Sequence, residues 1–233
     1  MELVGNAWEE MGTSLVDEEQ YTVQDSTFLV TVVNDEDNPD YIPPKGVFGE
    51  YDQMNDIRSK EQSLVLKFDN LNPDIKGAAK KILSSMTSQK GQSFLMYDQM
   101  KMFVYGDSPD ISETESDVRF FIQFGTGDEY YKLTKPVYDN WDEDQQRNAI
   151  DLDLNWLTTL KNLDQESIEK TNPNDTFTDS LNYKRYEFID ENNKEYKKIE
   201  IVGNPSLSRL QYFIVGVENN KDHPITGEVW LDE

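Results

Sequence analysis

The stretch from residue 94 to residue 125 has the clearest pattern of hydrophobic and polar positions in the chain. Between Val118 and Phe124 every second side chain is apolar, which is the two-residue period of a strand. Residues 100–104 alternate in the same way, although Met96, Met100 and Phe103 would also share one side of a helix. Because both faces of these two segments are apolar or aromatic, the pattern predicts two neighbouring strands at the centre of a sheet that is packed on each face.

Other segments alternate similarly and predict further strands. They are residues 28–33, 62–70, 130–138, 150–154, 186–190, 195–201, 210–217 and 225–233. Pro136 lacks a backbone N–H, so residues 130–138 are expected to be an edge strand or to end as a strand near this proline. Gly216 predicts a bulge or a close approach of another segment within residues 210–217.

Two segments have helical spacing instead. Residues 74–85 follow Pro73 and carry an apolar stripe, so they are expected to form a helix across one end of the fold. Trp156, Leu157 and Leu160 predict a short helix directly after the strand at 150–154. Residues 34–61 and 164–180 are polar, rich in turn residues and without a sustained period, so both are expected to be exposed loops that present contact surfaces.

Many strands with loop-rich connections predict a mainly β fold. The expected architecture is an antiparallel two-sheet β-sandwich, of jelly-roll or galactose-binding-like type, with one or two short helices. Residues 1–20 are expected to be an N-terminal extension, and residues 21–233 the β-sandwich domain. The last predicted strand stops while its pattern is still apolar, so the chain is expected to be a fragment of a longer polypeptide.

The charge balance narrows the possible partners. Asp and Glu number 46 against 22 Lys and Arg, which gives a net charge of −24. Such a field repels phosphate backbones and anionic lipid headgroups, so we expect no nucleic-acid partner. No run approaches the roughly 20 apolar residues that cross a bilayer as a helix, so any membrane contact is expected through missing parts of a parent chain. Without cysteine, disulfides and thiolate chemistry are excluded.

Candidate catalytic groups are weak. His223 is the one histidine, and a general base or metal ligand is less expected there than an exposed loop residue. Asp151 and Asp153 lie on one strand face at a separation that suits glycosidase carboxylates, which are roughly 5–10 Å apart. In a chain with 46 acidic residues, a solvated strand face is the better interpretation of this pair.

Two further groups could bind a ligand. The acidic loop at 34–40 has enough oxygens for calcium but lacks the glycine and the closing glutamate of the twelve-residue calcium loop, which favours a solvated turn. Four aromatic residues gather around one predicted loop and could stack on sugar rings, or could equally pack over the sheet edge, which we favour. They are Tyr130, Tyr131, Tyr138 and Trp141.

Several phrases of the sequence resemble one known family in order and spacing. They are VTVVNDEDNPDYIPPKGV, EQSLVLKFDNL, YDQMKMFVYGD, RFFIQFGTGDEYYKLTKPVY, NAIDLDLNWLTTLK, VGNPSLSRLQYFIVGVEN and ITGEVWLDE. Together they span about residues 28–233 and resemble a soluble segment of the SprA/Sov family. Members of that family are giant outer-membrane proteins of Bacteroidota that form the translocation channel of the type IX secretion system and serve gliding motility.

The resemblance implies a non-enzymatic domain at the cell surface or outer membrane, facing the periplasm or the exterior. Its implied partners are secreted cargo proteins and companion outer-membrane subunits of the translocon, and it implies no catalytic residue, metal or cofactor. The residues themselves leave a second function open, a carbohydrate-binding module of a surface polysaccharide-processing protein. A hydrolase with a carboxylate pair is the third and least expected function.

Overall fold

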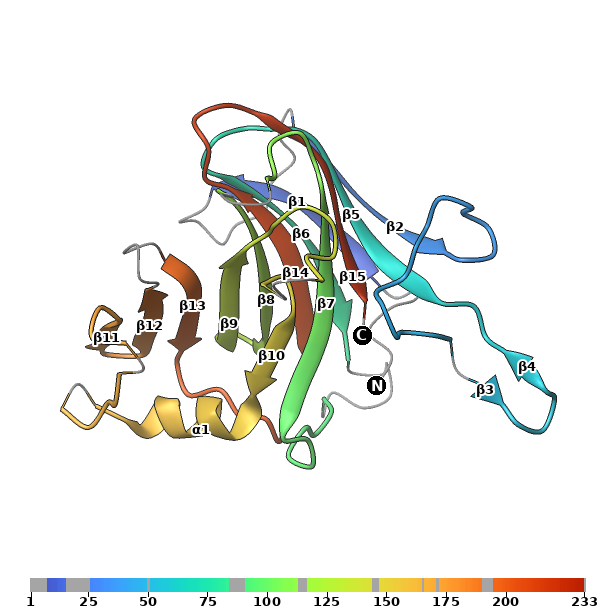
Figure 1. The fold of residues 1–233 in the computed structure, drawn as a ribbon. Coiled ribbons are helices and arrows are strands. Elements are labelled where there is room, and N and C mark those ends of the chain that lie inside the picture. The colour runs from blue at the N-terminus through green and yellow to red at the C-terminus, as the bar shows by residue number, and fades with distance from the viewer. Residues whose placement is uncertain are drawn as a thin grey trace.

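The computed structural model describes residues 8–15, 26–49, 51–83, 91–112, 117–143, 147–164, 166–170, 172–189 and 195–232. Two antiparallel sheets of eight and five strands face each other and enclose one main core (Figure 1). One helix is present in this described part. The expectation of a mainly β, two-sheet sandwich is therefore confirmed.

The larger sheet has the strand order β1-β6-β14-β8-β9-β13-β12-β11. Its strands are β1 (Trp8–Leu15), β6 (Ile75–Ile82), β8 (Val118–Thr126), β9 (Glu129–Pro136), β11 (Thr176–Ser180), β12 (Tyr183–Ile189), β13 (Glu195–Val202) and β14 (Tyr212–Asn219). β8 and β9 are joined through Gly127, whose φ of 58° suits a tight hairpin turn. β1 lies within the stretch expected to be an N-terminal extension, and it forms the edge of this sheet beside β6.

The smaller sheet has the strand order β10-β7-β15-β5-β2. Its strands are β2 (Thr27–Asn34), β5 (Gln62–Leu71), β7 (Gln99–Asp107), β10 (Ile150–Asp153) and β15 (Ile225–Asp232). The helix α1 (Leu154–Asn162) follows β10 directly, as the sequence predicts, and Asp153 caps its N-terminus by accepting a hydrogen bond from the backbone N–H of Trp156. A small hairpin of β3 (Tyr51–Asp52) and β4 (Ile57–Arg58) stands away from both sheets (Figure 1).

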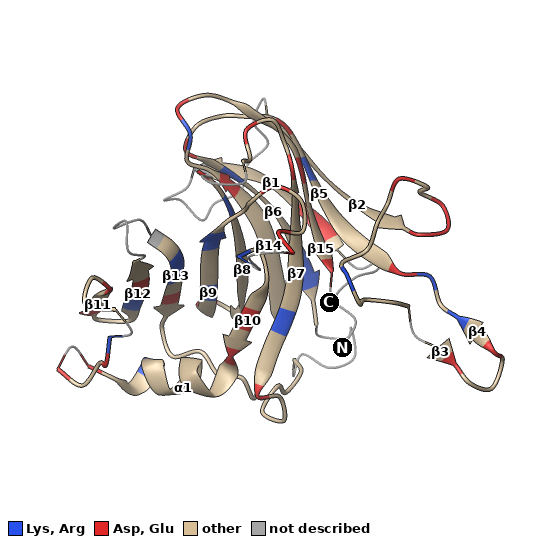
Figure 2. Ribbon diagram, in the orientation of Figure 1, with Lys and Arg blue, Asp and Glu red and all other residues tan. Residues whose placement is uncertain are grey.

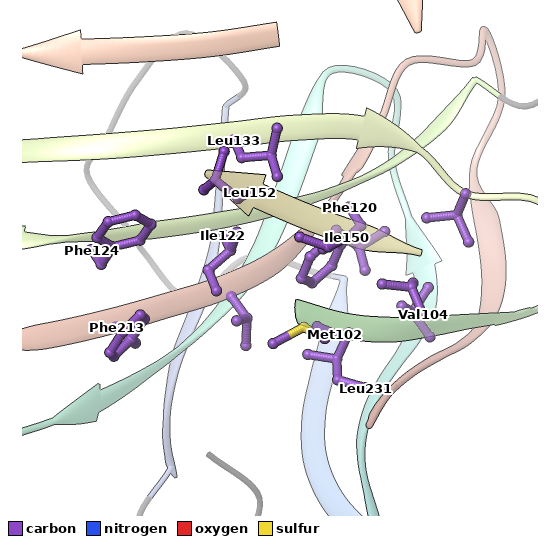
Figure 3. Close-up of a cluster of buried hydrophobic side chains, with 14 of the residues drawn as sticks. Met102, Val104, Phe120, Ile122, Phe124, Leu133, Ile150, Leu152, Phe213 and Leu231 are labelled. Carbon is purple, nitrogen blue, oxygen red and sulfur yellow. The ribbon is translucent and has the colours of Figure 1, made fainter. Parts of the chain in front are cut away.

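The core lies between the two sheets. In Figure 3, side chains of β8, β9 and β14 from the larger sheet meet side chains of β7, β10 and β15 from the smaller one. Phe120 and Ile122 are fully buried there, opposite Met102 and Val104. Apolar burial of this kind contributes about 25 cal/mol per Å². The buried aromatic rings of the core, such as that of Phe120, therefore supply much of the stability of a chain that is low in aliphatic residues.

The two central segments are strands, but they are not neighbours in one sheet. β8 lies between β14 and β9, while β7 lies between β10 and β15 of the opposite sheet. The prediction of a hydrogen-bonded pair is therefore wrong. Both segments have an apolar core face because they face each other across the core instead of lying side by side. The expectation that each face is packed is confirmed for β8 but is wrong for β7, whose outer face includes Phe103, 37% exposed.

The helix expected at 74–85 is wrong as well. Residues 75–82 form β6, which pairs with β1 on one side and β14 on the other. Its small residues have a packing reason, because a Cβ on Gly77 would lie 2.2 Å from the ring of Phe28. Non-local pairing thus overrides a local helical spacing.

Three smaller predictions have mixed outcomes. β9 ends at Pro136 but is an inner strand, so the second of the two alternatives for residues 130–138 holds. Residues 176–180, expected in a loop, form the edge strand β11, which pairs with β12. A Cβ on Gly216 would lie 2.3 Å from the carbonyl oxygen of Gly77, which confirms the expected close approach.

Candidate interaction surface

The two ends of the sandwich differ in the side chains that they expose. At one end β6 ends, β7 begins and β8 turns into β9; we call it the apolar end, and it lies at the bottom of Figure 1. The turns at the opposite end, around residues 69–74, 107–112 and 220–224, expose no large apolar side chain. Their acidic residues colour that end red in Figure 2.

Two structures at the apolar end carry several exposed apolar side chains each, besides the single residues Ile82 and Leu181. One is the segment 48–58, which includes the β3–β4 hairpin and is called the arm below. The other is the turn at residues 94–97. The exposed side chains are Phe48 (68%), Tyr51 (52%), Met54 (95%) and Ile57 (62%) in the arm, and Leu95 (64%), Met96 (90%) and Tyr97 (50%) in the turn. Within each of these two structures the exposed apolar side chains lie close together along the chain, and patches of exposed apolar groups can mark interaction sites.

The arm is held in shape by its own polar groups. Asp52 accepts hydrogen bonds from the backbone N–H groups of Met54 and Asn55, at 2.8 and 3.3 Å, and closes the turn between β3 and β4. The side-chain amide of Asn55 also donates to Asp52, and this hydrogen bond lowers the pKa of that carboxyl. The apolar side chains are therefore displayed on a turn whose backbone donors are satisfied.

The sides of the arm are also fixed. The guanidinium of Arg58 lies 5.2 Å from the centre of the Phe48 ring, a cation–π contact. A Cβ on Gly49 would lie 1.8 Å from the carbonyl oxygen of Ser59, so only glycine allows the two passes of the chain to come so close. The hydroxyl of Tyr51 donates a hydrogen bond to Asp56, which raises the pKa of this tyrosine.

A buried polar cluster anchors the base of the arm to the smaller sheet. The hydroxyl of Tyr41 lies 2.8 Å from Ser63 Oγ and donates to Asp232 Oδ2 at 3.0 Å, and Ser63 Oγ donates to the same oxygen at 3.0 Å. Burial raises the pKa of Tyr41 far above its usual value, so it remains a donor. The Tyr41 ring also packs on Trp230, at 5.6 Å between centroids.

The segment 34–61, which contains the arm, is called the excursion below. Its last residue, Glu61, directly precedes β5 and lies near the same buried cluster. Burial, and then repulsion from Asp232, raise the pKa of its carboxyl. On the other side of the excursion, Trp141 Nε1 donates to the backbone oxygen of Ile42 at 2.9 Å. The excursion at 34–61 is therefore attached to the sandwich at its base and exposed at its tip.

The second apolar structure, the turn at 94–97, is equally fixed. The backbone N–H of Phe94 donates to Leu207 O at 2.7 Å, and its ring packs edge-on against Phe213. Tyr97 N–H donates to Phe94 O, which closes the turn. Asp98 then binds the first turn of α1 through its backbone oxygen and its carboxylate. Leu95, Met96 and Tyr97 thus face outward from a turn that is held by the core.

The carboxylates that the sequence singles out have structural roles. Asp151 lies 3.7 Å from Lys101 on an exposed strand face, and Asp153 caps α1. In the acidic loop, Asn34 Oδ1 accepts from the backbone N–H groups of Glu36 and Asp37, so this side chain closes the turn. Within the described ranges, no group of three or more His, Asp or Glu residues is arranged to hold a metal ion.

His223 is an exposed loop residue, as expected, and it bridges two loops. Its Nε2 lies 2.8 Å from Asp110 and its Nδ1 2.8 Å from Asp222. The hydrogen bonds to these two carboxylates, Asp110 first, raise the pKa of the imidazole. This contact ties the 107–112 turn to the 220–224 turn at the end opposite the arm.

The four aromatic residues considered as a sugar platform pack into the fold. Tyr130 and Trp141 are each 8% exposed, Tyr131 is 1% exposed and Tyr138 is half-buried. Trp141 packs against Tyr105, at 5.0 Å between centroids, and Tyr131 packs against Phe124. Buried rings cannot stack on a saccharide, so the interpretation that these residues pack is confirmed.

Sequence reasoning found one part of the candidate surface and missed the other. The segment 34–61 was expected to be exposed, and it includes the arm. The turn at 94–97 precedes the alternation at residues 100–104, and the sequence pattern does not predict its exposure. The available signal was the loss of two-residue alternation before Gln99, where β7 begins.

Comparison with known proteins assigns the chain to a family. A family model described as "Motility related/secretion protein" matches residues 1–233. No curated protein matches the chain. Among solved structures, one titled "Structural analysis of an exo-beta-agarase" is similar at 10% identity and a TM-score of 0.40. The match covers 95% of this chain but only 25% of that one, so this chain spans about a quarter of its length. Among the described residues, no helix has the length and apolar character needed to span a bilayer.

Proposed function

Because the chain belongs to the SprA family of motility-related and secretion proteins, we propose that it is a non-enzymatic domain that works through protein contacts at its apolar end. The domain belongs to the outer-membrane translocon of the type IX secretion system and gliding machinery, at the cell surface or in the periplasm. Its partners are secreted cargo proteins or companion outer-membrane subunits. Membership in a secretion-related family supports a cell-envelope location.

The observation that carries this proposal is the exposure of apolar side chains on two hydrogen-bonded segments, the arm and the turn at 94–97, at one end of the sandwich. Met54 at 95% and Met96 at 90% are almost fully exposed, although each lies in a turn held by several hydrogen bonds. Unbranched, polarizable methionine side chains adapt to varied apolar partners, which suits a surface that contacts proteins. With the candidate aromatic platform buried, the alternative of a carbohydrate-binding module loses its main support.

Site-specific photo-crosslinking in cells tests the proposal. A photoreactive amino acid at Met54 or Met96 is expected to give discrete adducts with other envelope proteins, identified by mass spectrometry. The matched control position is Asp222, exposed at the opposite end, where we expect no such adduct. Equal crosslinking from both ends, or none from Met54 and Met96, contradicts the proposal.

A second experiment connects the surface to function. Met54→Asp combined with Ile57→Asp places charge at the tip of the arm without touching the core. We expect secretion into the medium and spreading on agar to fall, while the thermal unfolding of the purified variant stays within about 2 °C of wild type. Calorimetry with short polysaccharides should give no heat; a reproducible micromolar signal would instead favour the carbohydrate-binding module.

A further inference from the structure

Two lysines lie opposite each other on the inner face of the larger sheet. β9 and β13 pair up to Thr134 and Lys198, and the next residue along each strand is Lys135 and Lys197. Both side chains point to the same face as Leu133 and Ile199, which belong to the core. Like charges directly opposite on neighbouring strands are destabilising, so this arrangement needs a compensating interaction.

Neither ammonium group has a carboxylate partner in the part of the chain that the structure describes. Lys135 Nζ donates a hydrogen bond to the backbone oxygen of Ala149 at 2.7 Å, and Lys197 Nζ lies 4.1 Å from the centre of the Phe188 ring. Both lysines are half-buried. Burial, and then repulsion from Lys197, lower the pKa of Lys135 to about 8, and burial lowers the pKa of Lys197.

The carboxylates whose charge acts on this pair, Asp142, Asp151 and Asp175, have other partners. Asp142 binds Arg147 at 2.6 Å, and Asp151 pairs with Lys101. Asp175 is 1% exposed and accepts from the backbone N–H groups of Asn172 and Ile189, both at 2.9 Å. The chain has 46 acidic residues for 22 basic ones, so the lack of an acidic partner among the described residues does not arise from composition.

We propose that Lys135 and Lys197 form a binding site for an oxyanion, a carboxylate, phosphate or sulfate group that bridges the two ammonium groups. An anion at this position removes the repulsion between the two ammonium groups. It also accepts hydrogen bonds from Lys135 Nζ, which otherwise donates to the Ala149 carbonyl, and from Lys197 Nζ, which otherwise lies over the Phe188 ring. Lys135 lies one residue before the end of β9, at the end of the sandwich opposite the arm. The site is therefore independent of the contacts proposed for the apolar end.

Acetylation of lysines in the wild-type protein tests the site directly. An excess of a water-soluble acetyl ester at pH 8, followed by peptide mass spectrometry, gives a rate for each lysine. With ~50 mM sodium phosphate in place of sodium chloride of equal ionic strength, acetylation of Lys135 and Lys197 is expected to slow at least about fivefold, as mass action gives for a Kd near 10 mM. Lys67, on the outer face of the other sheet and 55% exposed, is the internal control and is expected to keep its rate.

Two probes and two variants make the result decisive. Protection by phosphate assigns the site to a free inorganic anion, and protection by N-acetylglutamate alone assigns it to a carboxylate of a partner chain. Lys197→Met should abolish the protection of Lys135, whereas Lys67→Met should leave it intact. Absence of protection with both probes, or equal protection of Lys67, overturns the proposal.

Discussion

Removal of one hydroxyl group tests how the arm is anchored. Tyr41→Phe keeps the ring that packs on Trp230 and deletes only the oxygen that lies 2.8 Å from Ser63 Oγ and 3.0 Å from Asp232 Oδ2. Asp232 is 1% exposed, so water cannot easily replace the lost donor. A hydrogen bond to a charged group contributes about 1.5–3 kcal/mol, and we expect Tyr41→Phe to lower the free energy of unfolding by about that amount.

Thermal and urea unfolding measure this loss. For a domain of 150–250 residues, 1 kcal/mol shifts the Tm by about 2–4 °C, so Tyr41→Phe should lower the Tm by roughly 3–12 °C. The matched control is Tyr51→Phe, which removes a tyrosine hydroxyl from the exposed arm and should change the unfolding free energy by less than about 0.5 kcal/mol. If both variants unfold with the wild type, the buried cluster does not anchor the arm and this reasoning fails.

Three further predictions concern charged groups. Glu218 is 1% exposed, and Lys132→Met removes the ammonium group that lies 2.8 Å from its carboxylate. This variant should lower the free energy of unfolding in urea by about 3–5 kcal/mol, and the double variant with Glu218→Leu should recover most of that loss. Glu61→Gln should raise stability at pH 7 and have little effect below pH 4, because a carboxyl whose pKa is raised on folding destabilises the fold as the pH rises through that pKa; equal effects at both pH values would contradict this. The pKa of His223 is raised on folding by Asp110, so its contribution is present below the ordinary value of 6.5 and is lost as the pH rises through the folded value; unfolding curves from pH 5 to 9 should show this slope in wild type and lose it in His223→Gln.

Local alternation predicted most of the strands because a half-buried strand repeats every two residues. β10 shows this most simply, with Ile150 and Leu152 buried and Asp151 and Asp153 exposed. For β2 the strand is confirmed, but its pattern, apolar on both faces, does not predict which face is buried. In the structure it is an edge strand, and Leu29 is 48% exposed because its face has no covering layer there.

The identity of each strand's neighbour could not be predicted from the sequence. Alternation in β7 and β8 describes which side chains are buried, and a strand buried against the opposite sheet has the same pattern as one beside its sequence neighbour. β7 and β8 therefore belong to different sheets, although their patterns predict two neighbours in one sheet. For β6, Ala78 and Ala79 fit a helical stripe as well as a strand, and only the approach of the Phe28 ring explains why residue 77 has no side chain.

The candidate surface depends on a property that no local pattern contains, namely which apolar residues remain without a covering element. Phe94 and Leu95 are adjacent and both apolar, yet the ring of Phe94 packs on Phe213 while Leu95 is 64% exposed. The difference arises because the turn is fixed by Leu207, more than 100 residues later in the chain, which accepts the backbone hydrogen bond of Phe94. Because long-range contacts decide which side chains face outward, a contact surface of this kind follows from the fold, and its charge-substituted variants should lose partner binding without losing stability.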